Sequence, residues 1–460
     1  MESKWEFVKA IEYCSSVRDG THGTPKKQPD GKKLITSKNI VGNRLDQTTA
    51  YYISEDDYCE INKRSKVDQG DVLLSMIGTV GASCLILNEP DFAIKNVGLF
   101  KTRSILDGKW LFYYLKSRLG QQQVESRLSG STQKFISLSS LRELPVIIPP
   151  SDAEKQKVTQ ILGTLDDKIE LNRKMNKTLE AMAQALFQSW FVDFDPVIDK
   201  ALANGKEIPE ELSHRVEVRK KAREEFPELF NKYSDLFPDS FHYTEELGWI
   251  PEGWVSGRLG NIAKARGGYA FKSNCFLDKG YTVVKIKNLV GDGTVSLENS
   301  QCISEETANT VNRFILKDGD IVMAMTGATV GKSGVIVTNG RPVYLNQRVA
   351  KFESASEQRI EPFVFCYFRE TKHYDYIVGT SGGSAQPNIS STQIESAPCT
   401  IPHLSVIRYF TNEADIWLKK WIQNMESNRL ITKLRDTLLP KLISGEIDVS
   451  KFETTVSEHL

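Results

Sequence analysis

The sequence predicts a mixed α/β protein in which one strand-rich α+β domain and one long helix are written twice. Short motifs recur in order along the chain, at an offset that drifts from 249 to 252 residues. Lys38-Asn39-Ile40 returns as Lys287-Asn288-Leu289. Ser129-Gly130-Ser131, followed by Gln133, returns as Ser381-Gly382-Gly383-Ser384, followed by Gln386. A repeat of this kind predicts pseudo-twofold symmetry and suits a protein that binds two similar but non-identical targets.

Residues 1–150 are expected to form the first domain. Short β-like runs bounded by turns occur at residues 33–36, 71–76 and 144–148, and one amphipathic helix is expected over residues 110–119. The second domain, residues 251–403, repeats this plan with residues 362–369 in the place of that helix. Each half is long enough to bury a core of its own.

A heptad-like seam follows each domain, over residues 151–192 and 404–446. The first seam runs from Val158 to Trp190 in alternating steps of four and three, and eight of its ten positions are apolar. This spacing is typical of a coiled coil. The second seam repeats it and places asparagines at the same register. The repeated seam asparagines are Asn172, Asn176, Asn424 and Asn428.

An asparagine inside a seam lowers stability but selects the partner and the register, because its amide is satisfied only opposite another polar group. We therefore expect the two helices to pair with each other as an antiparallel coiled coil, with the four asparagines setting its register. Such a pair would carry the two domains to opposite ends of a rod. The alternative is that the asparagines lie on solvated faces of separate helices.

The remaining segments are a connector and a tail. Residues 193–250 form an acidic connector, and the alternating charges of residues 215–225 within it indicate an exposed helix. The simplest interpretation of the connector is a solvated link between the halves. Residues 447–460 are expected to form an extended C-terminal tail.

Composition is that of an ordinary globular protein, with 40% hydrophobic and 26% charged residues and a net charge of zero. No apolar run approaches the ~18 residues that span a membrane, and the N-terminal residues lack the apolar core of a signal peptide. The seven cysteines form no CxxC pair and the six histidines are scattered. These features predict a cytoplasmic protein with reduced thiols, no bound metal and no membrane partner.

Catalytic motifs are not evident. Residues 326–333, Thr-Gly-Ala-Thr-Val-Gly-Lys-Ser, approximate a phosphate-binding loop, but Thr326 stands where that motif needs its first glycine. The matching residues 77–83 of the first domain have no lysine, so a glycine turn explains both segments better. We expect no catalytic residue and no cofactor on this chain.

Loops in both domains mix the side chains that contact base edges and phosphates in protein–DNA complexes. The candidate DNA contacts in the first domain are Arg18, Thr21, His22, Lys26, Lys27, Lys38, Asn39, Gln133 and Lys134. Those in the second domain are Arg266, Tyr269, Lys272, Lys287, Asn288, Gln386 and Asn388. Each could equally be a solvated turn residue, and Asn39 and Asn288 could cap a turn.

The order domain, helix, domain, helix resembles the specificity subunit of type I restriction-modification systems along nearly the whole chain. Four strings carry the resemblance together: Arg-Asp-Gly-Thr-His-Gly-Thr-Pro at 18–25, Ser-Trp-Phe-Val-Asp-Phe-Asp-Pro-Val at 189–197, Leu-Gly-Trp-Ile-Pro-Glu-Gly-Trp at 247–254 and Leu-Ile-Ser-Gly-Glu-Ile at 442–447.

The resemblance implies two target recognition domains that each read one half of a split, asymmetric double-stranded DNA target. It also implies paired helices that set the gap between the halves and bind two modification subunits. Those subunits would use S-adenosylmethionine to methylate adenine N6. Restriction subunits would add translocation and cleavage driven by ATP and Mg. A rival interpretation is a duplicated protein- or carbohydrate-binding adaptor with a dimerising coiled coil, and a nuclease or P-loop ATPase ranks third.

Overall fold

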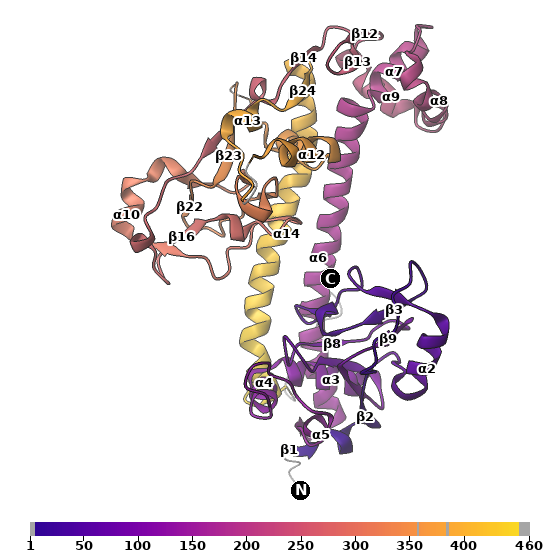
Figure 1. Ribbon diagram of the computed structural model, residues 1–460, viewed down its shortest axis with the longest axis vertical. Coiled ribbons are helices and arrows are strands. Elements are labelled where there is room, and N and C mark those ends of the chain that lie inside the picture. Colours follow the sequence, from indigo (N-terminus) through magenta and orange to yellow (C-terminus); the bar gives the residue numbers. More distant parts are fainter. Residues whose placement is uncertain (1–4, 357, 383–385, 450–460) are drawn as a thin grey trace. The chain divides into compact units, whose positions relative to one another are not determined.

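A computed structural model of the chain describes residues 5–356, 358–382 and 386–449 (Figure 1). Contacts divide the chain into two compact units, one made of Met1–Glu170 with Arg429–Leu460 and the other of Leu171–Asn428. Each unit holds one strand-rich domain together with parts of both long helices. The units are described separately below. Most of the predicted tail, residues 450–460, lies outside the described residues.

The first domain is built mainly from two small sheets. The larger has the order β2 (Ser16–Asp19), β10 (Val97–Lys101), β7 (Val72–Ser75) and β8 (Ser83–Leu85). The smaller has the order β6 (Tyr51–Ile53), β3 (Lys32–Ile35) and β9 (Phe92–Ile94). Two further pairs are β1 (Glu6–Lys9) with β11 (Pro145–Ile148) and β4 (Ile40–Val41) with β5 (Arg44–Leu45). The expected strands are all present.

The α-helices that accompany these strands are α1 (Ala10–Tyr13), α2 (Glu55–Ser65), α3 (Ile105–Lys116), α4 (Arg118–Glu125) and α5 (Leu138–Arg142). The helix expected over residues 110–119 begins earlier and breaks sooner. Ser104 caps α3 by accepting from the Asp107 amide, and Ser117 caps α4 by accepting from the Gly120 amide. Serine caps of this kind fix where a helix starts, so one predicted helix becomes two.

The second domain repeats the strand order of the first. Its larger sheet has the order β15 (Ala263–Gly267), β23 (Val349–Ser354), β20 (Ile321–Ala324), β21 (Ser333–Val335) and β17 (Gly293–Thr294). Its smaller sheet has the order β18 (Cys302–Ile303), β16 (Tyr281–Val284), β22 (Val343–Leu345) and β19 (Ile315–Leu316). The parallel pair β16–β22 matches the parallel pair β3–β9, and β14 (Val255–Arg258) with β24 (Pro398–Ile401) matches β1 with β11. The internal repeat is therefore confirmed.

The helices of the second domain are α10 (Glu305–Thr310), α11 (Glu361–Tyr367), α12 (Thr371–Thr380) and α13 (Ser391–Glu395). The helix expected over residues 362–369 is α11. Pro362 lies in its first turn, where a missing N–H costs nothing.

Two long helices provide the predicted coiled coil: α6 (Asp152–Phe187) and α14 (Leu404–Ile443). A π-helical turn, Gln188–Val192, extends α6 to the end of the predicted seam. Within the second unit Asn172 of α6 pairs with Asn428 of α14 and Asn176 pairs with Asn424, so these segments run antiparallel. Within the first unit Asp166 of α6 pairs with Arg435 of α14. Seam residues such as Val158 and Phe410 are buried. No helix of the described residues is both long enough and apolar enough to cross a membrane.

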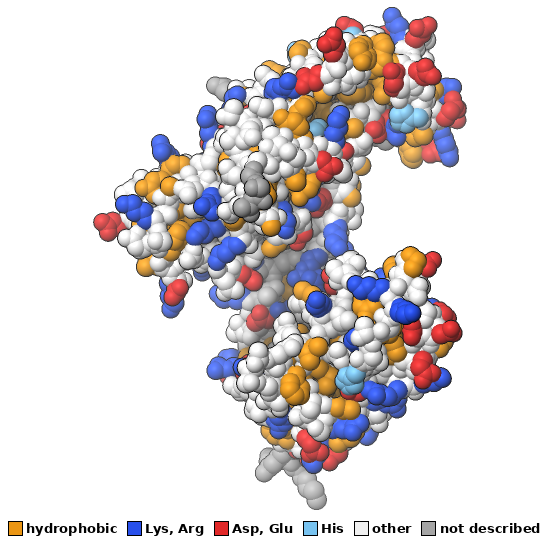
Figure 2. Space-filling view, viewed as in Figure 1, with side chains coloured by type: hydrophobic (Ala, Val, Ile, Leu, Met, Phe, Trp, Pro, Cys, Tyr) orange, Lys and Arg blue, Asp and Glu red, His pale blue; other side chains and the backbone are white. Residues whose placement is uncertain are grey.

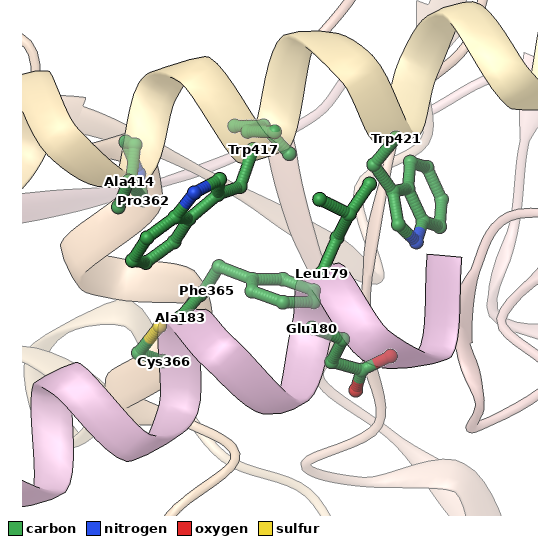
Figure 3. A pocket seen from close by; sticks show the side chains of 10 residues that line it. Leu179, Glu180, Ala183, Pro362, Phe365, Cys366, Ala414, Trp417 and Trp421 are labelled. Carbon is green, nitrogen blue, oxygen red and sulfur yellow. The ribbon is translucent and has the colours of Figure 1, made fainter. Parts of the chain in front are cut away.

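The second domain is fixed to the helix pair of its own unit through α11. Figure 3 shows Phe365 and Cys366 of α11 beside Leu179 and Ala183 of α6 and Trp417 and Trp421 of α14. One ion pair closes this apolar contact, with the Arg369 guanidinium 2.7 Å from the Glu180 carboxylate. Burial raises the pKa of Glu180, and the charge of Arg369 acts in the opposite direction.

The connector is folded, which corrects the expectation of a solvated link. It contains α7 (Asp195–Ala203), α8 (Val216–Glu225), α9 (Pro227–Tyr233) and the hairpin β12 (Phe241–Thr244) with β13 (Gly248–Pro251). The expected exposed helix is α8. Asp195 and Asp199 of α7 are only 3% and 2% exposed. They are neutralised by arginines twenty residues further along the chain, a pairing that local charge alternation does not reveal.

Candidate nucleic-acid interface

In the second domain, four backbone segments lie side by side and present polar side chains. The Gln347 amide donates to the Tyr269 carbonyl at 3.0 Å, and the Met325 amide donates to the Arg348 carbonyl at 2.9 Å. On the other side the Gly327 amide donates to the Pro387 carbonyl at 2.8 Å, and residues 326 and 388 form a β-bridge. We call the side chains on these segments the second strip: Tyr269, Thr326, Gln347, Arg348, Gln386 and Asn388. All of them except Tyr269 line one open hollow.

The first domain has the same backbone arrangement. Thr21 forms a parallel bridge with Lys95, as Tyr269 does with Asn346, and Ile77 forms an antiparallel bridge with Phe135, as Thr326 does with Asn388. We call the corresponding side chains the first strip: Thr21, Ile77, Lys95, Asn96 and Phe135. Ser129 bridges to Phe135 as Gly382 bridges to Asn388, so the structure aligns Ser129 with Gly382. The sequence motif instead matches Ser129 with Ser381, one residue earlier.

A glycine makes this close approach possible in both domains. A Cβ atom at Gly20 would lie 2.3 Å from the Ile94 carbonyl oxygen, and one at Gly268 would lie 2.1 Å from the Leu345 carbonyl oxygen. Both distances are too short for any side chain, so glycine is required at both positions. Gly20 and Gly268 therefore allow the two backbone segments of each strip to pack closely together.

The DNA-contact candidates of the first domain fall into two groups. His22 is positioned by its own domain, because its ring nitrogens lie 2.8 Å from Asn96 Oδ1 and 2.9 Å from Asp19 Oδ2. Arg18 donates to the Arg64 carbonyl at 2.8 Å. The remaining exposed candidates are Lys26, Lys27, Lys38, Gln133 and Lys134, while Thr21 is half-buried.

In the second domain, Tyr269, Gln386 and Asn388 belong to the second strip. The Tyr269 ring is held against Phe271 and Phe314, with centroids 5.0 Å and 5.6 Å away. Arg266, Lys272 and Lys287 are exposed elsewhere on the domain. Residues 383–385 of the predicted loop, including Ser384, lie outside the described residues.

The expectation that Asn39 and Asn288 contact DNA is wrong. They are 2% and 3% exposed. Asn39 Oδ1 accepts from the Thr36 amide and Asn39 Nδ2 donates to the Asp46 carbonyl, while Asn288 bonds in the same way with Lys285 and Ser296. Their amides are satisfied within the fold, so both asparagines hold a turn, as the alternative interpretation has it.

Sequence reasoning did not single out Gln347 and Arg348, which no repeated motif marks, and it assigned Thr326 only to a repeated glycine turn. Arg348 lies beside a pair of lysines on the same domain. The pKa of Lys285 is lowered by burial and by the positive charges of Lys287 and Arg348. On the face shown in Figure 2, Lys and Arg side chains lie over β16 and β22 of the second domain and over β3 and β9 of the first. Such cations suit the phosphate backbone of DNA.

The four seam asparagines meet in one polar layer inside the second unit. Asn172 Nδ2 donates to Asn428 Oδ1 at 2.9 Å, and Asn424 Nδ2 donates to Asn176 Oδ1 at 2.8 Å. The repeat relates Asn172 to Asn424 and Asn176 to Asn428, so the two bonds are equivalent under it. All four side chains are buried, which rules out the alternative of solvated faces. Their role in setting the register stays a prediction.

Neither a metal site nor a phosphate-binding loop emerges from the described part of the chain. It contains no group of three or more His, Cys, Asp or Glu side chains that could hold a metal ion. Residues 326–333 turn between β20 and β21, where Gly327 and Gly331 have φ values of 75° and 81°. A phosphate-binding loop instead joins a strand to a helix.

The fold and its strips define a two-headed binding protein whose heads share a backbone and differ in the side chains that they expose. A family model described as the type I restriction modification DNA specificity domain matches residues 2–181 and 251–408. The chain belongs to this family, and the resemblance given by the sequence motifs is confirmed.

Individual relatives agree. The chain is 27% identical to the type I restriction enzyme HindI specificity subunit of Haemophilus influenzae, over 85% of this chain and 91% of the relative. It is 25% identical to the MjaIX specificity subunit of Methanocaldococcus jannaschii, over 75% of this chain and 70% of the relative. The crystal structure of the S subunit of a type I restriction-modification system from M. genitalium has the same fold, with a TM-score of 0.54, 15% identity and 96% of each chain covered.

Proposed function

We propose that this chain reads DNA for a type I restriction-modification complex, with one recognition domain for each half of a split, asymmetric target. The difference between the strips supports this most directly. Thr326 and Asn388 stand in the second strip where Ile77 and Phe135 stand in the first. The exposed amide of Asn388 and the exposed ring of Phe135 favour different base edges, since amides pair with adenine and apolar groups contact the thymine methyl. The two heads then prefer different sequences.

Catalysis belongs to partners in this proposal. Two modification subunits bind the paired helices, take up S-adenosylmethionine and methylate adenine N6 after flipping the base from the duplex. Restriction subunits add translocation and cleavage with ATP and Mg, in the cytoplasm where the DNA lies. The proposed domains are residues 1–150 and 251–403, with the segments 151–192 and 404–446 as paired helices and 193–250 as connector.

The test is adenine-methylation mapping of a bacterial host that carries this chain together with its modification subunit. The control host carries the modification subunit alone. We expect a new split motif, methylated in both parts and with a fixed gap, only when this chain is present. A complex that forms but methylates no new motif would contradict the proposal and favour the adaptor. The adaptor also predicts no DNA binding, whereas a DNA reader loses affinity steeply as salt rises.

A further inference from the structure

We propose that Gln347 and Arg348, together with Gln386 and Asn388, form the base-reading set of the second recognition domain, and that they contact purine edges in the major groove. This inference rests on the proposed function and assigns it to particular side chains. Arginine pairs with guanine O6 and N7 through two hydrogen bonds, and glutamine or asparagine pairs with adenine N6 and N7 in the same way. The set therefore has the chemistry to read both purines.

The backbone beneath these side chains is fixed in advance. The Gln347 amide is bonded to Tyr269, the Arg348 carbonyl to Met325, and the Ile389 amide to the Met325 carbonyl at 2.9 Å. Asn388 is bonded through its amide to the Gly382 carbonyl at 2.9 Å. Because these bonds use main-chain groups, they position Gln347, Arg348 and Asn388 without occupying their side chains. Rigid placement of this kind lowers the entropy that binding must overcome.

The four side chains are free to bind a ligand. Each is exposed and lines the hollow, and among the described residues none of their side chains makes a hydrogen bond or an ion pair. Gly327 lies beside Gln386. A Cβ atom there would lie 3.8 Å from Gln386 Nε2 and 3.8 Å from Ile286 Cδ1, and its φ of +75° disfavours other residues.

Positive charge borders the same hollow. Arg348 lines the hollow, and burial together with the positive charges of Lys287 and Arg348 lowers the pKa of Lys285. Neither lysine nor Arg348 has a carboxylate partner among the ion pairs of the described residues. Lys285 instead donates to Gln301 Oε1 and Lys287 to the Asn299 carbonyl. Unpaired cations beside amide groups fit a DNA backbone running past the bases that are read.

The first domain lacks this set at the equivalent place. Only Lys95 and Asn96 separate β9 from β10, whereas Asn346, Gln347 and Arg348 separate β22 from β23. Lys95 Nζ donates to Thr24 Oγ1 at 2.7 Å, and Asn96 Oδ1 is bonded to His22. The first domain thus uses these polar groups to hold its own loop. In the second domain this connection is one residue longer, and the Arg348 side chain is exposed and has no such partner among the described residues.

The test uses the full chain with its modification subunits and the same methylation map. We expect Gln347→Ala and Arg348→Ala each to relax one or two base positions in one half of the motif, by about 10- to 100-fold in discrimination, and to leave the other half unchanged. Arg348→Lys keeps the charge and loses the two-pronged geometry, so it should relax the same position. Arg341→Ala, an exposed arginine of the same domain, is the matched control and should change nothing.

The outcomes separate this inference from the proposed function. A split motif in the wild type that stays identical in all Gln347 and Arg348 variants would overturn the inference and leave the proposed function standing. Lower methylation at an unaltered motif would also overturn it, because a phosphate contact lowers affinity evenly across sequences. A wild-type complex without a split motif would remove both.

Discussion

The two recognition domains share a backbone and differ in what they expose on it. Gly20 and Gly268 approach equivalent carbonyl groups at the end of the facing strand, one in each domain. Asn39 and Asn288 likewise close equivalent turns. On that common frame the first strip presents Ile77 and Phe135, and the second presents Thr326 and Asn388. The repeated motifs are therefore structural, and the reading chemistry lies where the copies disagree.

The largest effect on the DNA target should come from replacing one whole recognition domain. Replacing residues 1–150 by the matching domain of another family member should change one half of the DNA target completely, because each domain carries its own strip. Discrimination at the original half should fall by roughly 1,000-fold or more, the usual gap between specific and non-specific binding. Methylation mapping measures this. A change in both halves would mean that the domains do not read independently.

The connector offers a test that does not involve the two recognition domains. Arg215 contacts the buried carboxylate of Asp195 through two nitrogens, at 3.0 Å and 2.8 Å. Arg215→Ala should lower the free energy of unfolding by about 3 kcal/mol, because it leaves a buried charge without its main partner. Urea denaturation followed by tryptophan fluorescence measures this, since Trp190 packs on Phe237 of the connector.

Lys220→Ala is the control for Arg215→Ala. Lys220 lies on α8 and pairs with Glu217 on the surface, so its loss should cost about 0.5 kcal/mol or less. Equal effects of the two substitutions would show that the connector is the solvated link that its acidic sequence suggests.

The sequence predicted the features that depend on periodicity and repetition. Steps of four and three from Val158 onward predicted a helix with a buried stripe, and the recurrence of Asn172 as Asn424 predicted a shared polar layer. The sequence predicted the helix boundaries less well. Ser104 and Ser117 act as caps through single hydrogen bonds to nearby amides, and isolated serines are too common to mark a start.

The site was harder to predict because the repeated motifs mark residues that hold the backbone shared by the two domains. Asn39 recurs as Asn288 since both copies need the same turn, and this recurrence made them attractive as DNA contacts. Gln347 and Arg348 do not recur, because they fill a connection that is one residue longer in the second copy. A search for positions where the copies diverge beside a glycine that both copies share, such as Gly268, could have found them.

The polar layer offers a smaller test, at the place where the copies agree most closely. Asn172→Leu should lower the free energy of unfolding by about 2 kcal/mol, because it leaves the buried Asn428 amide without its partner. The double variant with Asn428→Leu should recover most of that loss, since two apolar groups can face each other. A double-mutant cycle from urea denaturation measures the coupling, and additive effects would show that the 2.9 Å contact carries no energy.

The smallest effect on stability, and the finest test of the comparison, comes from exchanging one side chain between the strips. Phe135 is 41% exposed and Asn388 is exposed, so Phe135→Asn and Asn388→Phe should each change the free energy of unfolding by about 0.5 kcal/mol or less. Their effect on the target should be larger. Phe135→Asn gives the first strip a second amide besides Asn96, and should favour adenine over thymine at one position by about 10-fold in the methylation map. Asn388→Phe should shift one position of the other half in the opposite direction. If both variants fold and leave every position unchanged, the bases are read by side chains outside the two strips.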